Sequence, residues 1–188
     1  PGGAFHVAQS GHCLDQLSTI AFLAACTTRL RLLTSVLVVP HRPAMLTAKM
    51  LATIDVLSKG RLIVGAGAGW LKEEFAALGV NFPDRGALTD ETLAAFIELW
   101  TRERPSFSGS HVKFDEVVFE PKPIQKPHPP LWIGGESPPA IRRAIRYGTT
   151  WYPGNNSQTV PLDTADRLAA AIARVKALCR SAGRDPET

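Results

Sequence analysis

The segment GGESP at positions 134–138 has the composition of an anion-binding turn between a strand and a helix. Gly134 and Gly135 let the backbone approach a ligand closely, Ser137 is placed to cap the helix, and the proline after it suits the first helical position. Such a turn directs free backbone N–H groups and the positive end of the helix at one point, which suits a phosphate. Arginines at positions 142–143 could add positive charge one turn later. A tight connection that binds nothing is the alternative.

A second candidate is the glycine-rich segment GAGAG at positions 65–69. Its spacing differs from the G-x-G-x-x-G of a dinucleotide-binding turn, and the acid about 20 residues further on, Asp84, falls in a predicted turn rather than at a strand end. Small residues such as Gly67 and Gly69 leave room beside a strand for a flat ring or for another backbone segment. A glycine-rich loop without a ligand is the alternative.

A third candidate is a pair of hydroxyl residues, Thr34 and Ser35, that interrupts an apolar strand just before Val36. Buried hydroxyl groups must form hydrogen bonds. These two either bond to the backbone or face a ligand at the end of the strand, and the sequence leaves both interpretations open.

The sequence contains no pattern typical of hydrolytic or metal chemistry. It has no G-x-S-x-G motif, no catalytic Cys/His signature and no P-loop, and its five histidines share no metal-ligand spacing. We therefore expect no metal site and assign no catalytic residue. The acidic residues that show no paired arrangement are Asp84, Asp90, Glu91 and Glu116.

The composition is that of an ordinary globular domain, with 188 residues, 45% hydrophobic residues, 20% charged residues and a net charge of +4. The positive charge is scattered, so we expect no nucleic-acid groove. The apolar runs are shorter than the roughly 18 residues of a membrane span. The three cysteines form no close pair, which favours a reducing compartment, and we expect a cytoplasmic protein.

Apolar runs and helical periodicity alternate along the chain, which predicts an α/β fold with a parallel sheet. This alternation does not distinguish a doubly wound sheet from a barrel. An excursion rich in proline occupies about 105–130, with a hairpin-like stretch at 112–119. The predicted strands are 30–39, 61–64, 131–133 and 149–152; the predicted helices are 15–27, 43–58, 73–78, 89–101, 138–147 and 162–182.

A set of short strings distributed in order along nearly the whole chain resembles the bacterial luciferase-like monooxygenase family. Within that family the chain looks most like the actinobacterial oxidoreductases that use coenzyme F420, a deazaflavin. The strings are TRLRL at 28–32, LATIDVLSKGRL at 51–62, GAGAGW at 65–70 with EEF at 73–75, FEPKP at 119–123, HPPLWIGG at 128–135 and AGRDP at 182–186.

The resemblance implies a (β/α)8 TIM barrel, in which the ligand lies at the C-terminal ends of the strands. It implies that Ser35 and Val36 form a strand bulge whose cis peptide bond supports the cofactor ring from behind. It places Gly67 and Gly69 in the loop beside the ring.

The resemblance also implies that Gly134, Gly135 and Ser137 hold the cofactor phosphate, in agreement with the local chemistry of that turn. The family's first two strands and its last strands have no counterpart here. Only about four of the eight strands can be found, and 188 residues is short of the roughly 200–250 expected for the barrel. We therefore expect residues 1–188 to be one partial barrel domain, starting inside a longer protein.

The expected function is that of an oxidoreductase that transfers a hydride between coenzyme F420 and a small organic substrate. The first alternative is an FMN-dependent monooxygenase on the same barrel. The second is an inactive barrel fragment that acts as an assembly partner. We expect a homodimer.

Overall fold

The computed structural model describes residues 13–154 and 160–187 of the chain. The helices are α1 (Gln16–Cys26), α2 (Ala44–Leu57), α3 (Lys72–Ala77), α4 (Arg85–Thr101), α5 (Pro138–Tyr147) and α6 (Ala165–Ser181), with short 3-10 turns at Val39–His41 and Phe82–Asp84. The strands are β1 (Leu32–Leu33), β2 (Leu37–Val38), β3 (Leu62–Gly67), β4 (Phe107–Ser108), β5 (Lys113–Phe114), β6 (Leu131–Gly134) and β7 (Thr150–Tyr152).

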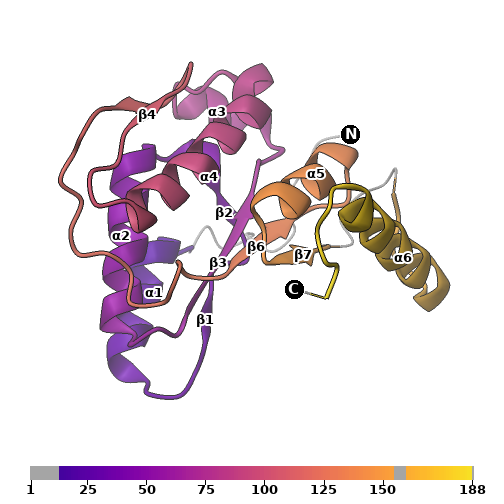
Figure 1. The fold of residues 1–188 in the computed structure, drawn as a ribbon, viewed down its shortest axis with the longest axis horizontal. Coiled ribbons are helices and arrows are strands. Elements are labelled where there is room, and N and C mark those ends of the chain that lie inside the picture. The colour runs from indigo at the N-terminus through magenta and orange to yellow at the C-terminus, as the bar shows by residue number, and fades with distance from the viewer. Residues whose placement is uncertain (1–12, 155–159, 188) are drawn as a thin grey trace.

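The main sheet is parallel, and its strands lie side by side in the order β1–β3–β6–β7, with β2 also paired to β3. This spatial order follows the chain order without a reversal. A doubly wound sheet would reverse its order at a switch point, whereas a barrel does not. Figure 1 shows α1, α2 and α4 beside the first strands of the sheet, and α5 and α6 beside its last two.

The first predicted strand, 30–39, is divided into β1 and β2 by a bulge. Five positions separate Leu32 from Leu37, but only four separate their partners on β3, Leu62 and Ala66. One extra residue is therefore accommodated between the two pairings, as in a β-bulge. The peptide bond Ser35–Val36 within this segment is cis, which is the geometry that the resemblance implies.

One element boundary that differs from the prediction is that of β3, which continues through Gly67 instead of ending at Val64. The extension has a tertiary cause, because β3 pairs with β2 on one side and with β6 on the other. All residues of β3 are buried. Helix α4 likewise begins at Arg85, four positions before Thr89.

The N-terminal end of the sheet is closed by two charged side chains that are fully bonded. Asp55 is 0% exposed, and its carboxylate accepts the backbone N–H and the side-chain amide of Gln125 at 3.0 and 2.7 Å. The guanidinium of Arg61 donates to carbonyl oxygens at the end of α1 and in the loop after it. These acceptors belong to Ala24, Thr27 and Leu30, at 2.8 Å each.

The predicted excursion contains the antiparallel pair β4–β5, in which Phe107 lies opposite Phe114. A carboxylate on α4, that of Glu91, fastens this hairpin to the helix. It accepts the backbone N–H groups of Ser110, His111 and Val112 at 2.7–3.0 Å. The excursion is therefore docked against the outside of the strand–helix layers.

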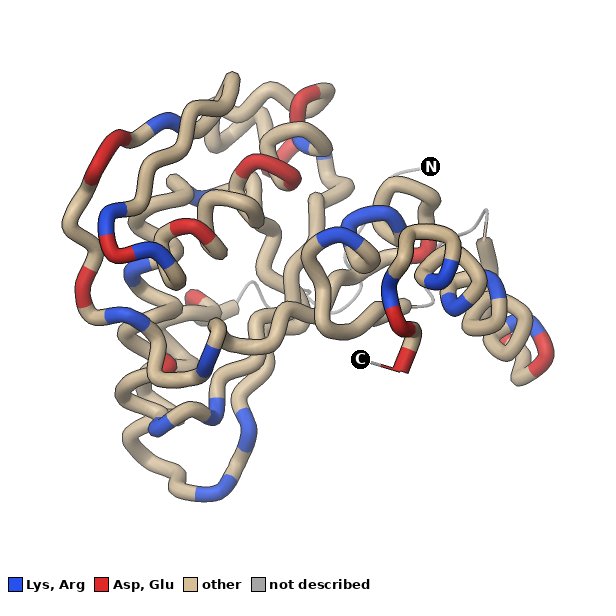
Figure 2. The backbone as a smooth tube through the Cα atoms, in the orientation of Figure 1, with Lys and Arg blue, Asp and Glu red and all other residues tan. Residues whose placement is uncertain are grey.

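Charged side chains are interspersed along most elements, and arginines concentrate on α5 (Figure 2). Within residues 13–154 and 160–187, no helix combines the length and apolar character needed to cross a membrane. That part of the chain also contains no cluster of three or more His, Cys, Asp or Glu side chains able to hold a metal ion.

Candidate functional site

A cavity of about 480 Å³ opens at the C-terminal ends of the strands. This volume lies within the range of small-molecule sites. It is lined by the bulge between β1 and β2 and by the last residues of β3, β6 and β7 with the segments that follow them, which are distant in sequence. All seven residues that the sequence predicts at a cofactor line this one cavity: Ser35, Val36, Gly67, Gly69, Gly134, Gly135 and Ser137.

The bulge before β2 explains the alternating glycines of β3. A Cβ atom on Gly65 would collide with the backbone oxygen of Thr34, and one on Gly67 would lie 2.8 Å from Cγ2 of Val36. A Cβ atom on Gly134, on the other neighbouring strand, would lie 3.2 Å from Cγ1 of Val36. Val36 therefore takes up the space that glycine leaves at 67 and 134, and at these positions the cavity wall is backbone.

The two hydroxyl residues of the bulge have different roles. The Thr34 hydroxyl is buried and donates to the backbone oxygen of Gly65 at 2.8 Å. Ser35 lines the cavity, where its Oγ lies 3.1 Å from the hydroxyl of Tyr152. The backbone interpretation therefore holds for Thr34, whereas Ser35 and Tyr152 present a polar pair to the cavity.

Ser137 is the N-cap of α5, and its hydroxyl oxygen accepts the N–H of Ala140 at 3.4 Å. The turn offers fewer open N–H groups than its sequence suggests. The N–H of Gly135 donates to the backbone oxygen of Tyr152 at 3.2 Å, and the two residues after Ser137 are prolines without N–H. Within the described residues the N–H of Ser137 has no acceptor, and its hydroxyl retains a proton to donate.

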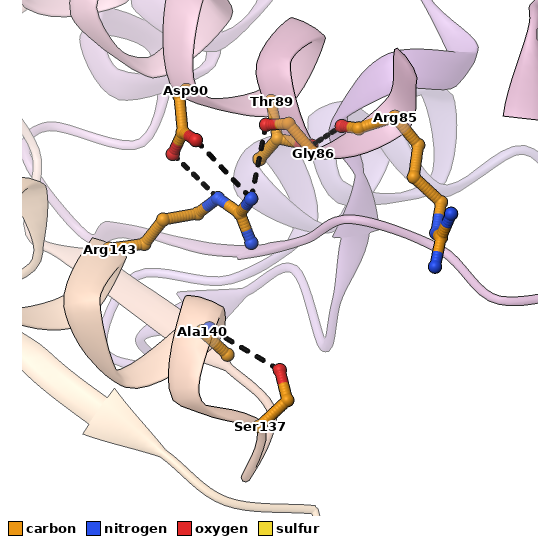
Figure 3. Close-up of polar contacts among 7 residues, drawn as sticks. All are labelled: Arg85, Gly86, Thr89, Asp90, Ser137, Ala140 and Arg143. Carbon is orange, nitrogen blue, oxygen red and sulfur yellow. Dashed lines mark hydrogen bonds and ion pairs between the residues drawn. The ribbon is translucent and has the colours of Figure 1, made fainter. Parts of the chain in front are cut away.

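Of the two arginines that the sequence places one turn after the glycines, at 142 and 143, only Arg143 lines the cavity. Its side chain is 10% exposed and reaches the first turns of α4 (Figure 3). There Nε donates to the carboxylate of Asp90 at 2.7 Å, and Nη2 donates to the backbone oxygen of Gly86 at 3.0 Å. Arg143 thus joins α5 to α4, whereas Arg142 is exposed.

Sequence reasoning missed two polar residues of the cavity, Glu136 and Tyr152. Glu136 is 7% exposed, and its carboxylate accepts the N–H of Gly154 at 2.6 Å. The signal for Glu136 was present, because an acidic residue is unexpected inside a predicted phosphate turn. The signal for Tyr152 was its place at the end of a predicted strand, since the ends of parallel strands share one edge of the sheet.

The motifs that carry this site match a known protein family. A profile of the luciferase-like monooxygenase family matches residues 3–188. The chain belongs to the luciferase-like monooxygenase family.

A curated member of the family, the FMNH(2)-dependent dimethylsulfone monooxygenase of Pseudomonas putida, is 36% identical over 156 residues. The match covers 80% of this chain and 42% of that relative. The chain spans about half the length of the curated relatives it matches.

Solved structures of the family share the fold. Monooxygenase RslO1 from Streptomyces bottropensis has a TM-score of 0.79 and 26% identity, and the match covers 92% of this chain and 51% of that one. The coenzyme F420 dependent tetrahydromethanopterin reductase from Methanopyrus kandleri has a TM-score of 0.76 at 19% identity, with the same coverage, and this likeness concerns the fold alone. The predicted incomplete (β/α)8 barrel is confirmed.

Proposed function

We propose that the protein is an oxidoreductase that binds a reduced flavin or deazaflavin in the cavity at the C-terminal ends of its strands. The observation that carries the proposal is the convergence of all seven sequence-predicted residues on that cavity. Membership of the luciferase-like monooxygenase family supports it. The cofactor supplies the electron or hydride chemistry when bound, while the protein supplies binding, orientation and electrostatics.

The residues present fit a flat ring with an anionic tail. The wall at Gly67 and Gly134 is backbone over the Val36 side chain, which leaves a surface without projecting side chains. At the other side of the cavity, Ser137 offers an N–H and an O–H at the positive end of α5, and Arg143 lines the same region.

In this proposal Val36 and the glycines beside it support the ring, and Ser137 holds the phosphate. Ser35 and Tyr152 are the polar groups placed to orient a ring edge or a substrate. The substrate is a small organic molecule.

For the cofactor we favour F420, which gives hydride transfer, with FMN as the alternative. A flavin activates oxygen through a ring nitrogen that the deazaflavin lacks, so FMN implies monooxygenation. The FMNH(2)-dependent relative from Pseudomonas putida supports the alternative. We further propose a homodimer in the cytoplasm, and sedimentation velocity tests the dimer.

The phosphate anchor is tested with two variants that both keep the helix cap. Asp and Asn are equally good N-caps, but Asp adds a negative charge where the phosphate is proposed to bind. We expect Ser137→Asp to weaken FMN binding at least tenfold relative to Ser137→Asn, measured by quenching of flavin fluorescence. Riboflavin, which lacks the phosphate, should bind both variants equally.

Equal FMN affinities of the two variants would contradict the proposal that the phosphate binds at Ser137. Parallel titration of the unmodified protein with F420 and FMN separates the cofactors, and oxygen consumption with reduced FMN would favour the monooxygenase. Binding of neither cofactor would favour the assembly-partner alternative.

A further inference from the structure

A second cavity, of about 520 Å³, is lined by residues of α4, α5 and α6, and we refer to it as the helix groove. Pro139, Arg142 and Arg146 line it from α5, and Leu178 lines it from α6. Arg143 lines both the helix groove and the cavity at the C-terminal ends of the strands. The two cavities therefore have one side chain in common.

The helix groove carries an excess of positive charge. Its charged lining residues are three arginines of α5 and one aspartate of α4, an excess of two positive charges (Figure 2). The aspartate, Asp90, is paired with Arg143 at 2.7 Å. Within residues 13–154 and 160–187, no ion pair includes Arg142 or Arg146, and both are exposed. Their charges are therefore available to an anion.

The two available arginines lie on one face of α5. They are four positions apart, a spacing that brings the Cβ atoms of a helix to about 5–6 Å from each other. Two like charges at this spacing destabilise a helix slightly, and an anion bound between them would reverse that effect. The guanidinium of Arg146 lies 5.0 Å from the ring centroid of Tyr147, which also lines the groove. The groove thus offers two cations beside apolar surface, which suits a flexible chain that carries carboxylates.

The helix groove begins close to the proposed phosphate anchor. Ser137 is the N-cap of α5. At a rise of about 1.5 Å per residue, Arg142 lies about 7.5 Å further along the helix axis and Arg146 about 14 Å. The FMN phosphate is the end of that molecule, so FMN does not extend to these arginines. The phosphodiester of coenzyme F420 continues into a lactyl group and a chain of glutamates, each of which adds a carboxylate.

We propose that the helix groove binds the glutamate chain of coenzyme F420 through Arg142 and Arg146. A guanidinium group donates two parallel N–H bonds to a carboxylate, so two arginines on one helix face hold successive carboxylates of such a chain. This inference rests on the proposed function, because it requires the phosphate to lie at Ser137.

The test uses three ligands with one ring system: deazariboflavin, the glutamate-free phospholactyl form of F420, and F420 with several glutamates. Their dissociation constants are measured by the change in deazaflavin fluorescence. In low salt we expect F420 to bind about fivefold more tightly than the glutamate-free form, because each exposed ion pair contributes modestly. This advantage should disappear at about 1 M salt, where charges are screened within about 3 Å.

The double variant Arg142→Gln, Arg146→Gln should remove the advantage of F420 and keep the affinity for the two shorter ligands. Glutamine has a helix propensity similar to that of arginine, so the variant is expected to fold. The double variant Arg29→Gln, Arg31→Gln is the matched control, since it removes the same charge at exposed positions outside the groove. The control should retain the advantage of F420.

Equal affinities of F420 and its glutamate-free form for the unmodified protein would overturn the proposal, and this comparison needs no variant to fold. An advantage that survives the loss of Arg142 and Arg146, or one that the control also loses, would overturn it as well. Micromolar binding of a free oligoglutamate peptide would assign the groove to an acidic protein segment instead of the cofactor.

Failure of the proposed function gives a different pattern. If deazariboflavin does not bind, the cavity is not a site for the ring, and both proposals fail. If deazariboflavin and the glutamate-free form bind equally, the phosphate is not held at Ser137, and the chain loses its starting point. If the phosphate strengthens binding and the glutamates add nothing, only the inference about the helix groove is lost.

Discussion

Polar side chains have opposite roles at the two ends of the parallel sheet: at one end they bond within the protein, and at the other they line a cavity. At the N-terminal end, the charged groups of Asp55 and Arg61 form their hydrogen bonds with other parts of the protein. At the C-terminal end, Ser35, Ser137 and Tyr152 line an open cavity with hydroxyl groups that can still bond to a ligand. In barrels of this type the first end contributes stability and the second contributes chemistry.

The difference originates in the backbone. The strand segments before the bulge pair regularly with β3, and polar side chains there only need to join helices to strands. After the bulge, Val36 fills the space beside two glycines, and the walls of the cavity become backbone. The cavity thus forms where regular side-chain packing over the sheet is interrupted.

The largest effect is expected for Asp55→Ala, at the N-terminal end of the sheet. Removal of the buried carboxylate takes away the acceptor of the Gln125 backbone N–H and one of the two acceptors of its side-chain amide. We expect a loss of about 3 kcal/mol in the free energy of unfolding, measured by urea denaturation. The ratio of FMN to riboflavin affinity should not change under conditions where the variant is folded. A loss below about 1 kcal/mol, or a changed ratio, would contradict the division between the two ends.

Arg143 is expected to contribute to both stability and binding, because it joins α5 to α4 and also lines the cavity. We expect Arg143→Met to cost about 1 kcal/mol of stability, since Asp90 is 42% exposed and water can solvate it. FMN affinity should fall several-fold while riboflavin affinity is kept.

Arg143→Lys separates the two roles of this side chain, since lysine retains the charge without the two-donor geometry. Recovery of FMN affinity in the lysine variant would assign the effect to charge, and continued weakness would assign it to the position of α5. Unchanged FMN affinity in both variants would show that Arg143 has no role in FMN binding.

The smallest effect is expected at Asp15, which caps α1 and lies outside the cavity. The backbone N–H of Ser18, together with the ion pair to Arg42, lowers the pKa of Asp15 from 3.8 to about 2. Because the pKa is lower in the folded state, the charge stabilises the protein above about pH 4, and this contribution is lost as the pH falls towards 2.

Asp15→Asn keeps the cap and removes the charge. With 38% of the Asp15 side chain exposed, we expect a loss of about 0.5 kcal/mol at pH 7. The difference in Tm between the variant and the unmodified protein should disappear near pH 2. A difference that persists at pH 2 would show that the charge is not its source.

Local signals in the sequence predicted much of this architecture. The boundaries of α5 agree with the prediction, because Ser137 and the proline after it define the helix start by local chemistry. Lys59 and Gly60 end α2 with positive φ values of 55° and 77°, as a left-handed cap requires. Each of these features depends on residues within one helical turn of each other.

The sequence by itself therefore determined the order of strands and helices, the family resemblance and the set of residues gathered at one end of the sheet. Only the tertiary structure decided that β3 continues through Gly67, that Thr34 serves the backbone while Ser35 faces the cavity, and that Glu136 and Tyr152 belong to it. The physical reason is that pairing between strands and the space around a bulge depend on segments distant in the chain, whereas capping and periodicity are local.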